Sequence, residues 1–138
     1  MKIKRFTSDD DIQVVKPLLS LATSENKAER ALFQYLKSKD QCLFLYEKEG
    51  ILAGCIGIEL SMNQKAVIQH IAVSQDYRKQ WIGKRMVEFI REQYNIRELR
   101  AETDDDAVGF YEKLGFEMES LSEKYKGVTR YQCTLFRN

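Results

Sequence analysis

Residues 77–86, YRKQWIGKRM, form a basic segment between an apolar run typical of a strand and an amphipathic run typical of a helix. The first N–H groups of a helix have no intrahelical acceptor, and together with the helix dipole they favour a bound anion. Arg78, Lys79 and Lys84 add positive charge at this point. Gly83 is the only glycine of the segment, although phosphate loops usually need glycine where the backbone approaches the anion. Two interpretations stay open for this segment alone, a phosphate-binding loop and a basic surface turn.

Residues 107–116, AVGFYEKLGF, form a second segment that contains a residue able to take part in catalysis. Its apolar residues share one helix face: Ala107, Phe110, Tyr111 and Leu114. A tyrosine hydroxyl has a pKa of about 10, so it stays protonated at neutral pH and can act as a general acid. Taken alone, however, the helical spacing favours the simpler interpretation, in which Tyr111 is an aromatic core residue.

A proton acceptor is harder to identify. His70 is the only histidine of the chain and lies in the apolar run 65–73. Strand alternation places it on the face opposite Gln69 and Ile71, and a bulge would reverse this. Glu59 and Glu102 are further candidates, and a chain of water molecules would serve equally well. The general base therefore stays open.

The cysteines and the acidic run predict no metal site. Cys42, Cys55 and Cys133 are widely spaced, form no C-x-x-C pattern and lie in apolar runs, which predicts buried free thiols. The run 104–106 lacks the spacing of a calcium-binding loop. A solvated helix start explains it.

Hydrophobic periodicity predicts the elements that must position these residues. In chain order they are a strand at 2–6, a helix at 8–22 with Ser8 as its N-cap, a helix at 25–39, a hairpin at 41–60 turning at Glu49-Gly50, a strand at 65–73, a helix at 82–93, a strand at 98–103, a helix at 104–116 stopped by Gly115, and a closing hairpin around Gly127. In the strand at 65–73 we expect Val67, Ile71 and Val73 on one face, and Ala66, Ile68 and Ala72 on the other. The order β-α-α-β-β-β-α-β-α-β-β predicts a mixed α/β sheet with helices on both faces.

The composition limits the class of protein. A length of 138 residues fits one domain, 1–138, and the formal net charge of +1 argues against a protein that binds nucleic acid by neutralising many phosphates. No apolar run approaches the roughly 18 residues of a membrane span, and the N-terminus turns acidic too early for a signal peptide. With reduced thiols, these features predict a cytoplasmic protein. The exposed edge of a mixed sheet also leaves room for a homodimer.

Together, and in this order, the two segments resemble the motifs of the GNAT superfamily of acyl-CoA N-acyltransferases. The family's first motif is a strand, then R/Q-x-x-G-x-G/A, then a helix, and here it reads Arg78-Lys79-Gln80-Trp81-Ile82-Gly83. Its second motif is N-x-x-A-x-x-x-Y followed by Gly-Phe, which here runs from Asp104 to Tyr111 and then to Gly115-Phe116. The order of elements also matches the family over nearly the whole chain.

The resemblance implies that two central parallel strands, 65–73 and 98–103, splay apart to hold acetyl-CoA. Backbone N–H groups at about Ile71 and Val73, beside a bulge, would stabilise the oxyanion that forms when an amine attacks the thioester. Tyr111 would protonate the departing thiolate. The residues that the resemblance assigns to the cofactor are Ile71, Ala72, Val73, Arg78, Lys79, Gln80, Trp81, Ile82, Gly83, Lys84 and Asp104, with no metal.

Two positions depart from the family pattern. Trp81 stands in place of the first glycine, which costs free energy only if the backbone there needs a positive φ. Asp104 stands in place of the asparagine; it can still cap a helix, but it brings negative charge near a polyanionic cofactor. Two functions therefore stay open: an acetyl-CoA-dependent N-acetyltransferase, and a non-catalytic CoA-binding or interaction protein that retains the fold. The expected acceptor is a small-molecule or peptide amine, entering from the side of the two N-terminal helices and the 41–60 hairpin.

Overall fold

The computed structural model of the chain describes residues 2–104, 107–125 and 128–136. Over that part it contains the predicted order of elements: β1 (Lys2–Arg5), α1 (Ile12–Leu19), α2 (Glu25–Lys37), β2 (Gln41–Lys48), β3 (Ile51–Ser61), β4 (Lys65–Val73), a short 3-10 helix (Gln75–Tyr77), α3 (Ile82–Gln93), β5 (Glu98–Asp104), α4 (Val108–Lys113), β6 (Glu117–Tyr125) and β7 (Val128–Phe136). None of the helices in the described ranges combines the length and the apolar composition needed to span a bilayer.

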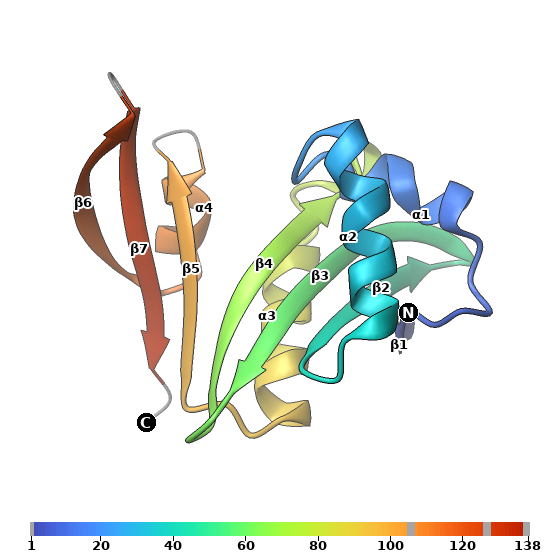
Figure 1. Cartoon of the computed structure of the whole chain (residues 1–138), viewed down its shortest axis with the longest axis horizontal. Helices are drawn as coiled ribbons and strands as arrows, with labels where there is room; N and C mark the ends of the chain where they lie inside the picture. Colours follow the sequence, from blue (N-terminus) through green and yellow to red (C-terminus); the bar gives the residue numbers. More distant parts are fainter. Residues whose placement is uncertain (1, 105–106, 126–127, 137–138) are drawn as a thin grey trace.

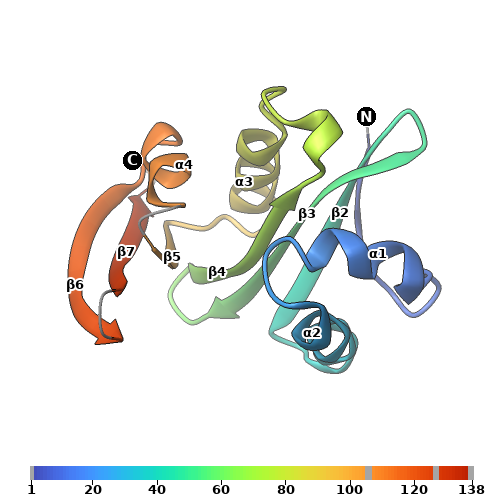
Figure 2. The ribbon, with the colours of Figure 1, turned by 90° about the horizontal axis from the view of Figure 1, so that it is seen from above.

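The seven strands of the described residues form one sheet, in the order β1-β2-β3-β4-β5-β7-β6. The pair β4–β5 is parallel, and the other neighbouring pairs are antiparallel. Helices α1 and α2 cover one face of the sheet and α3 and α4 the other (Figure 1 and Figure 2). Each face has its own hydrophobic cluster, with Leu19 and Leu32 on the α1/α2 side and Met86 and Ile90 on the α3/α4 side. The prediction of a mixed α/β sheet covered on both faces is confirmed.

Two local sequence patterns predicted their elements correctly, a hairpin turn and a helix. Glu49 and Gly50 form a two-residue hairpin loop, and both have a positive φ, of 54° and 79°. This is the conformation that a tight hairpin turn requires. Helix α3 spans Ile82–Gln93, as the spacing of its apolar residues predicted, because these residues form a continuous stripe buried against the sheet.

The first helix begins later than predicted. Asp11, and not Ser8, is the N-cap of α1, and its carboxylate accepts a hydrogen bond from the Gln13 N–H at 2.9 Å. The preceding residues form a separate turn, in which the Thr7 N–H donates to the Asp10 carboxylate at 2.8 Å. Several acidic and hydroxyl residues compete to cap this helix. Thr7 and Asp10 hydrogen-bond within the preceding turn, so the cap falls to Asp11.

The helix that carries Tyr111 is also shorter than predicted. Asp104 still belongs to β5, so α4 covers only Val108–Lys113. Gly115 follows with a φ of 94°, which confirms it as the residue that stops the helix. Residues 105 and 106 of the acidic run, and the predicted hairpin turn at Gly127, lie outside the described residues, although β6 and β7 pair antiparallel as expected.

Candidate functional site

The parallel strands β4 and β5 separate after a short stretch of pairing. Their register covers only three pairs: Lys65–Glu98, Ala66–Leu99 and Val67–Arg100. Figure 1 shows the two strands diverging from this point toward their C-terminal ends. A cavity of about 940 Å³ opens between them, lined by β4, β5, the segment leading into α3, and α4. The predicted splaying of the central strands is therefore confirmed.

A bulge interrupts β4 inside this gap. The pairing with β3 passes from Gly57–His70 to Ile58–Ile68, which leaves Gln69 without an opposite residue. Such an extra residue bends the strand and breaks its regular alternation. The bulge lies where β4 has already left β5, so it shapes the wall of the cavity.

The bulge changes which side chains of β4 share a face. Ahead of it, Ala66 and Ile68 belong to the cluster on the α3 side, and after it Ile71 packs against the same cluster. Ala72 belongs instead to the cluster under α1 and α2. The predicted grouping of Ile71 with Val67, and of Ala72 with Ile68, is therefore wrong, because that prediction assumed an unbroken strand.

The backbone N–H groups of Ile71 and Val73 face the gap. The Ser74 N–H donates to the Ala53 carbonyl of β3 at 2.8 Å. Because N–H directions alternate along a strand, the N–H groups of residues 71 and 73 point away from β3. On the same edge, the Val73 carbonyl accepts from Arg78 Nε at 3.3 Å. Two donors on one edge of the gap can stabilise a negatively charged oxygen.

The segment leading into α3 forms a basic rim. The Arg85 N–H donates to the Trp81 carbonyl at 3.0 Å, so the N–H groups of residues 82–84 come before the first bond of the helix and have no acceptor within it. Free N–H groups at a helix N-terminus and nearby cations both favour an anion. The cationic residues that line the cavity are Arg78, Lys79, Lys84, Lys113 and Arg130.

Trp81 is the N-cap of α3 and adopts the left-handed conformation, with a φ of 63°. Its side chain is 66% exposed, and Lys84 Nζ lies 5.6 Å from the ring centroid. An exposed ring at the rim leaves the cavity open. The neighbouring Gln80 does not line the cavity, since its side-chain oxygen accepts a hydrogen bond from Lys48 Nζ.

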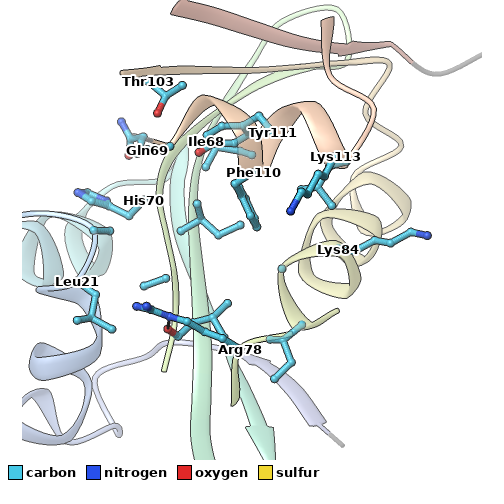
Figure 3. Close-up of a pocket in the computed structure, with 18 of the residues that line it drawn as sticks. Leu21, Ile68, Gln69, His70, Arg78, Lys84, Thr103, Phe110, Tyr111 and Lys113 are labelled. Carbon is cyan, nitrogen blue, oxygen red and sulfur yellow. Dashed lines mark hydrogen bonds between the residues drawn. The ribbon is translucent and has the colours of Figure 1, made fainter. Parts of the chain in front are cut away.

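Gly83 allows α3 and α4 to approach each other closely. It is buried, and a Cβ at this position would lie 2.7 Å from Cζ of Phe110. The ring of Phe110 is 37% exposed and projects from α4 into the cavity (Figure 3). The second glycine of the first motif thus leaves room for the Phe110 ring between the two helices.

Tyr111 lies on α4 beside Phe110 and lines the cavity. Only 6% of the residue is exposed, and its ring packs edge-to-face between Phe110 and Phe116, with centroid distances of 5.2 Å to each. Burial, with a smaller contribution from Cys133, raises the pKa of Tyr111 to about 12. The phenol is therefore protonated at neutral pH, as a general acid must be. Figure 3 shows its side chain beside Ile68 of β4.

Asp104 uses its carboxylate to hold the turn before α4. Its Oδ1 accepts a hydrogen bond from the Ala107 N–H at 3.2 Å, and the residue lines the cavity. The N-cap of α4 is Ala107, which has no side-chain capping bond, so Asp104 holds this turn from the end of β5 and does not cap the helix as expected.

His70 lies on the α1/α2 side of the sheet, as Figure 3 shows, and lines the cavity. Its Nδ1 is 2.6 Å from the Tyr35 hydroxyl of α2. Burial lowers the pKa of His70, so its imidazole is neutral at neutral pH. Glu102 also lines the cavity and lies 3.4 Å from Arg130 Nε, whereas Glu59 accepts from Gln41 at 3.1 Å and is not part of the lining.

Several residues of the site carried no signal in the sequence. Tyr35 was visible only as one apolar position of an amphipathic helix, and its partner is 35 residues away. Leu21 and Ala22, in the connection between α1 and α2, line the cavity as well. Only the way the N-terminal helices cross the sheet brings them there.

The chain is similar to known proteins in sequence and in fold. The family model described as acetyltransferase (GNAT) domain matches residues 39–118. A protein of Bacillus methanolicus, an uncharacterized N-acetyltransferase in the lysA 3′ region, is 32% identical over 104 residues, which cover 73% of this chain and 85% of that protein.

Solved structures show the same fold at lower identity. An aminoglycoside 6′-N-acetyltransferase complexed with coenzyme A superposes with a TM-score of 0.83 at 16% identity, covering 99% of this chain and 97% of the other. The ribosomal-protein-S18-alanine N-acetyltransferase from Escherichia coli gives a TM-score of 0.80 at 18% identity, covering 98% and 92%.

Proposed function

Because this chain belongs to the GNAT acetyltransferase family, we propose that it transfers an acetyl group from acetyl-CoA to a primary amine within a ternary complex. One observation carries the proposal: the N–H groups of Ile71 and Val73 face a gap between splayed strands, and the basic N-terminus of α3 lies at the rim of the same cavity.

The cavity offers separate surfaces to the two ends of acetyl-CoA. The free N–H groups of residues 82–84, with Arg78 and Lys79, suit the pyrophosphate. The gap beside the bulge suits the pantetheine and the thioester. Trp81 does not obstruct this arrangement, since its exposed ring lies at the rim.

The reaction then needs a donor to the oxyanion and a proton for the leaving group. The neutral amine attacks the thioester carbon, a C–N bond forms, and the negative charge on the carbonyl oxygen is stabilised by the N–H groups of Ile71 and Val73. As the C–S bond breaks, the Tyr111 hydroxyl donates its proton to the sulfur. The proton that the amine loses passes to water, and the tyrosinate then regains a proton.

The acceptor side of the cavity lies under α1 and α2, where Leu21, His70 and Glu102 line it. We assign the amine to this side, because the free N–H groups that suit the pyrophosphate lie at the start of α3, on the opposite face of the sheet from α1 and α2. A small molecule and a peptide N-terminus both remain candidates.

Thermal denaturation with increasing acetyl-CoA, and with acetate as a control, tests cofactor binding. Ligand at about 100 times its Kd stabilises the folded state by about 2.7 kcal/mol, which gives a measurable rise in Tm. Trp81 is the only tryptophan, so its fluorescence reports binding at the rim independently. No rise in Tm at millimolar acetyl-CoA would contradict the assignment.

A charge reversal locates the bound cofactor. We expect Lys79→Glu at the rim to weaken acetyl-CoA binding at least about tenfold, the scale of one charge-assisted contact. Lys39→Glu, exposed in the connection between α2 and β2, is the matched control and should leave affinity unchanged.

Release of free thiol from acetyl-CoA then tests catalysis, with glucosamine, an alanine-terminated peptide and cadaverine as amines. Binding of acetyl-CoA without thiol release from any amine would favour a non-catalytic CoA-binding protein.

A further inference from the structure

Tyr35 and His70 form a partly buried hydrogen bond beside the cavity. Tyr35 is 5% exposed, its hydroxyl lies 2.6 Å from His70 Nδ1, and the two rings meet edge-to-face at 5.7 Å. Gly57 of β3 makes the contact possible, because a Cβ at that position would overlap the Tyr35 hydroxyl. The fold thus reserves space for this hydroxyl next to the bulge of β4.

The direction of this hydrogen bond follows from its surroundings. Within the described part of the chain, His70 Nδ1 is the one hydrogen-bond partner of the Tyr35 hydroxyl. A buried hydroxyl that kept its proton without an acceptor would cost about 1–3 kcal/mol. Burial raises the pKa of Tyr35 and lowers that of His70, so the phenol is protonated and the imidazole neutral. The hydroxyl therefore donates and Nδ1 accepts.

A neutral imidazole that accepts at Nδ1 carries its proton on Nε2. We propose that Tyr35 is a positioning residue that fixes His70 as the Nε2–H tautomer, and that His70 donates a hydrogen bond to the acceptor molecule instead of taking its proton. This inference rests on the proposed function. Gly57 and Tyr35 set the tautomer, and Nε2–H is then the one ring N–H that His70 can offer to the cavity it lines.

The inference defines a class of acceptor. A donor on the α1/α2 side of the cavity matches an amine that carries an oxygen acceptor beside it, such as a hydroxyl or a carbonyl group. Glucosamine and a peptide N-terminus have such an oxygen, and cadaverine does not. We expect thiol release with one or both of the first two amines and none above background with cadaverine. A preference for cadaverine would overturn the assignment of His70 as a donor.

The tautomer is measurable without any substrate. His70 is the only histidine, so a long-range ¹H–¹⁵N spectrum of ¹⁵N-labelled protein at neutral pH shows a single imidazole. We expect an unprotonated Nδ1 and a protonated Nε2. In Tyr35→Phe, which removes only the hydroxyl, we expect a mixture of both tautomers. A wild-type protein with the proton on Nδ1, or shared between the nitrogens, would overturn the proposal even if acetyl-CoA binds.

Two variants of His70 show whether it acts as a hydrogen-bond donor or as a general base, measured with an amine that the protein turns over. Gln places an N–H near the position of Nε2 but cannot act as a base. For a donor, His70→Gln should retain kcat/KM within about threefold and His70→Ala should lose about tenfold, the value of one hydrogen bond. For a base, both would lose about a hundredfold or more. If no amine is turned over, the proposed function fails, and the spectrum still decides the tautomer.

Discussion

The backbone angle φ at Trp81 decides whether glycine or alanine is the more stabilising replacement at this position. Trp81 has a φ of 63° and a ψ of 20°, and its side chain forms no capping hydrogen bond. Trp81→Gly and Trp81→Ala remove the same exposed ring, so the loss of side-chain contacts cancels between them. The remaining difference is the cost of holding an L-residue in the left-handed region.

That difference can be estimated from two opposing terms. A residue with a Cβ pays about 1–2 kcal/mol in this conformation, and glycine loses about 0.5–1 kcal/mol more conformational entropy on folding. Central values leave about 0.8 kcal/mol in favour of glycine. For a chain of 138 residues this corresponds to a Tm about 2–4 °C higher for Trp81→Gly than for Trp81→Ala.

Thermal unfolding followed by circular dichroism measures this difference, and α3 supplies the control. Glu88 is exposed within the same helix, where φ is negative. Glu88→Gly should therefore be about 1 kcal/mol less stable than Glu88→Ala and should have the lower Tm. We therefore predict that glycine is the more stable of the two variants at position 81 and the less stable at position 88. If Trp81→Ala were as stable as Trp81→Gly, Trp81 would not occupy the left-handed region in solution.

Three further predictions concern packing, catalysis and pH. Gly57→Ala should destabilise the protein by about 1–3 kcal/mol, whereas Gly83→Ala should cost less, because the ring it meets is partly exposed and able to move; urea unfolding compares them. Tyr111→Phe should keep acetyl-CoA affinity and lower turnover at least about tenfold, and unchanged turnover would remove it from catalysis. Burial raises the pKa of the Cys55 thiol from 9.0 to about 12. Because the unfolded chain loses this proton at a lower pH than the folded protein, the free energy of unfolding should fall as the pH rises above 9. In Cys55→Ala, the urea midpoint should fall less steeply over the same pH range.

Much of the fold could be predicted because its signals are local. The spacing of Ile82, Met86 and Ile90 gives the exact extent of α3 from a single stripe of apolar residues. Gly50 and Gly115 mark a turn and a helix end because both need a positive φ. The boundaries of α1 were less predictable, since neighbouring Asp, Ser and Thr side chains compete for the same backbone N–H groups.

The site could be predicted where its residues lie close together in the chain. The order of Arg78 to Gly83 and of Asp104 to Tyr111 was sufficient to indicate a cofactor loop and a candidate acid, both of which line one cavity apart from Gln80. The space that Gly83 leaves for Phe110 was not visible, because it depends on the distance between two helices.

The sequence by itself determined the order of elements, the basic segment before α3 and the helix that carries Tyr111, since each follows from residues within a few positions of one another. Only the tertiary structure decided the rest. The register of β4 against β3 creates the bulge at Gln69, which reverses the faces of the strand. The packing of α2 on the sheet joins Tyr35 to His70 across 35 residues, and with that contact it fixes which imidazole nitrogen is left for the cavity. Such long-range pairings depend on how whole elements pack, and no local pattern of residue types encodes them.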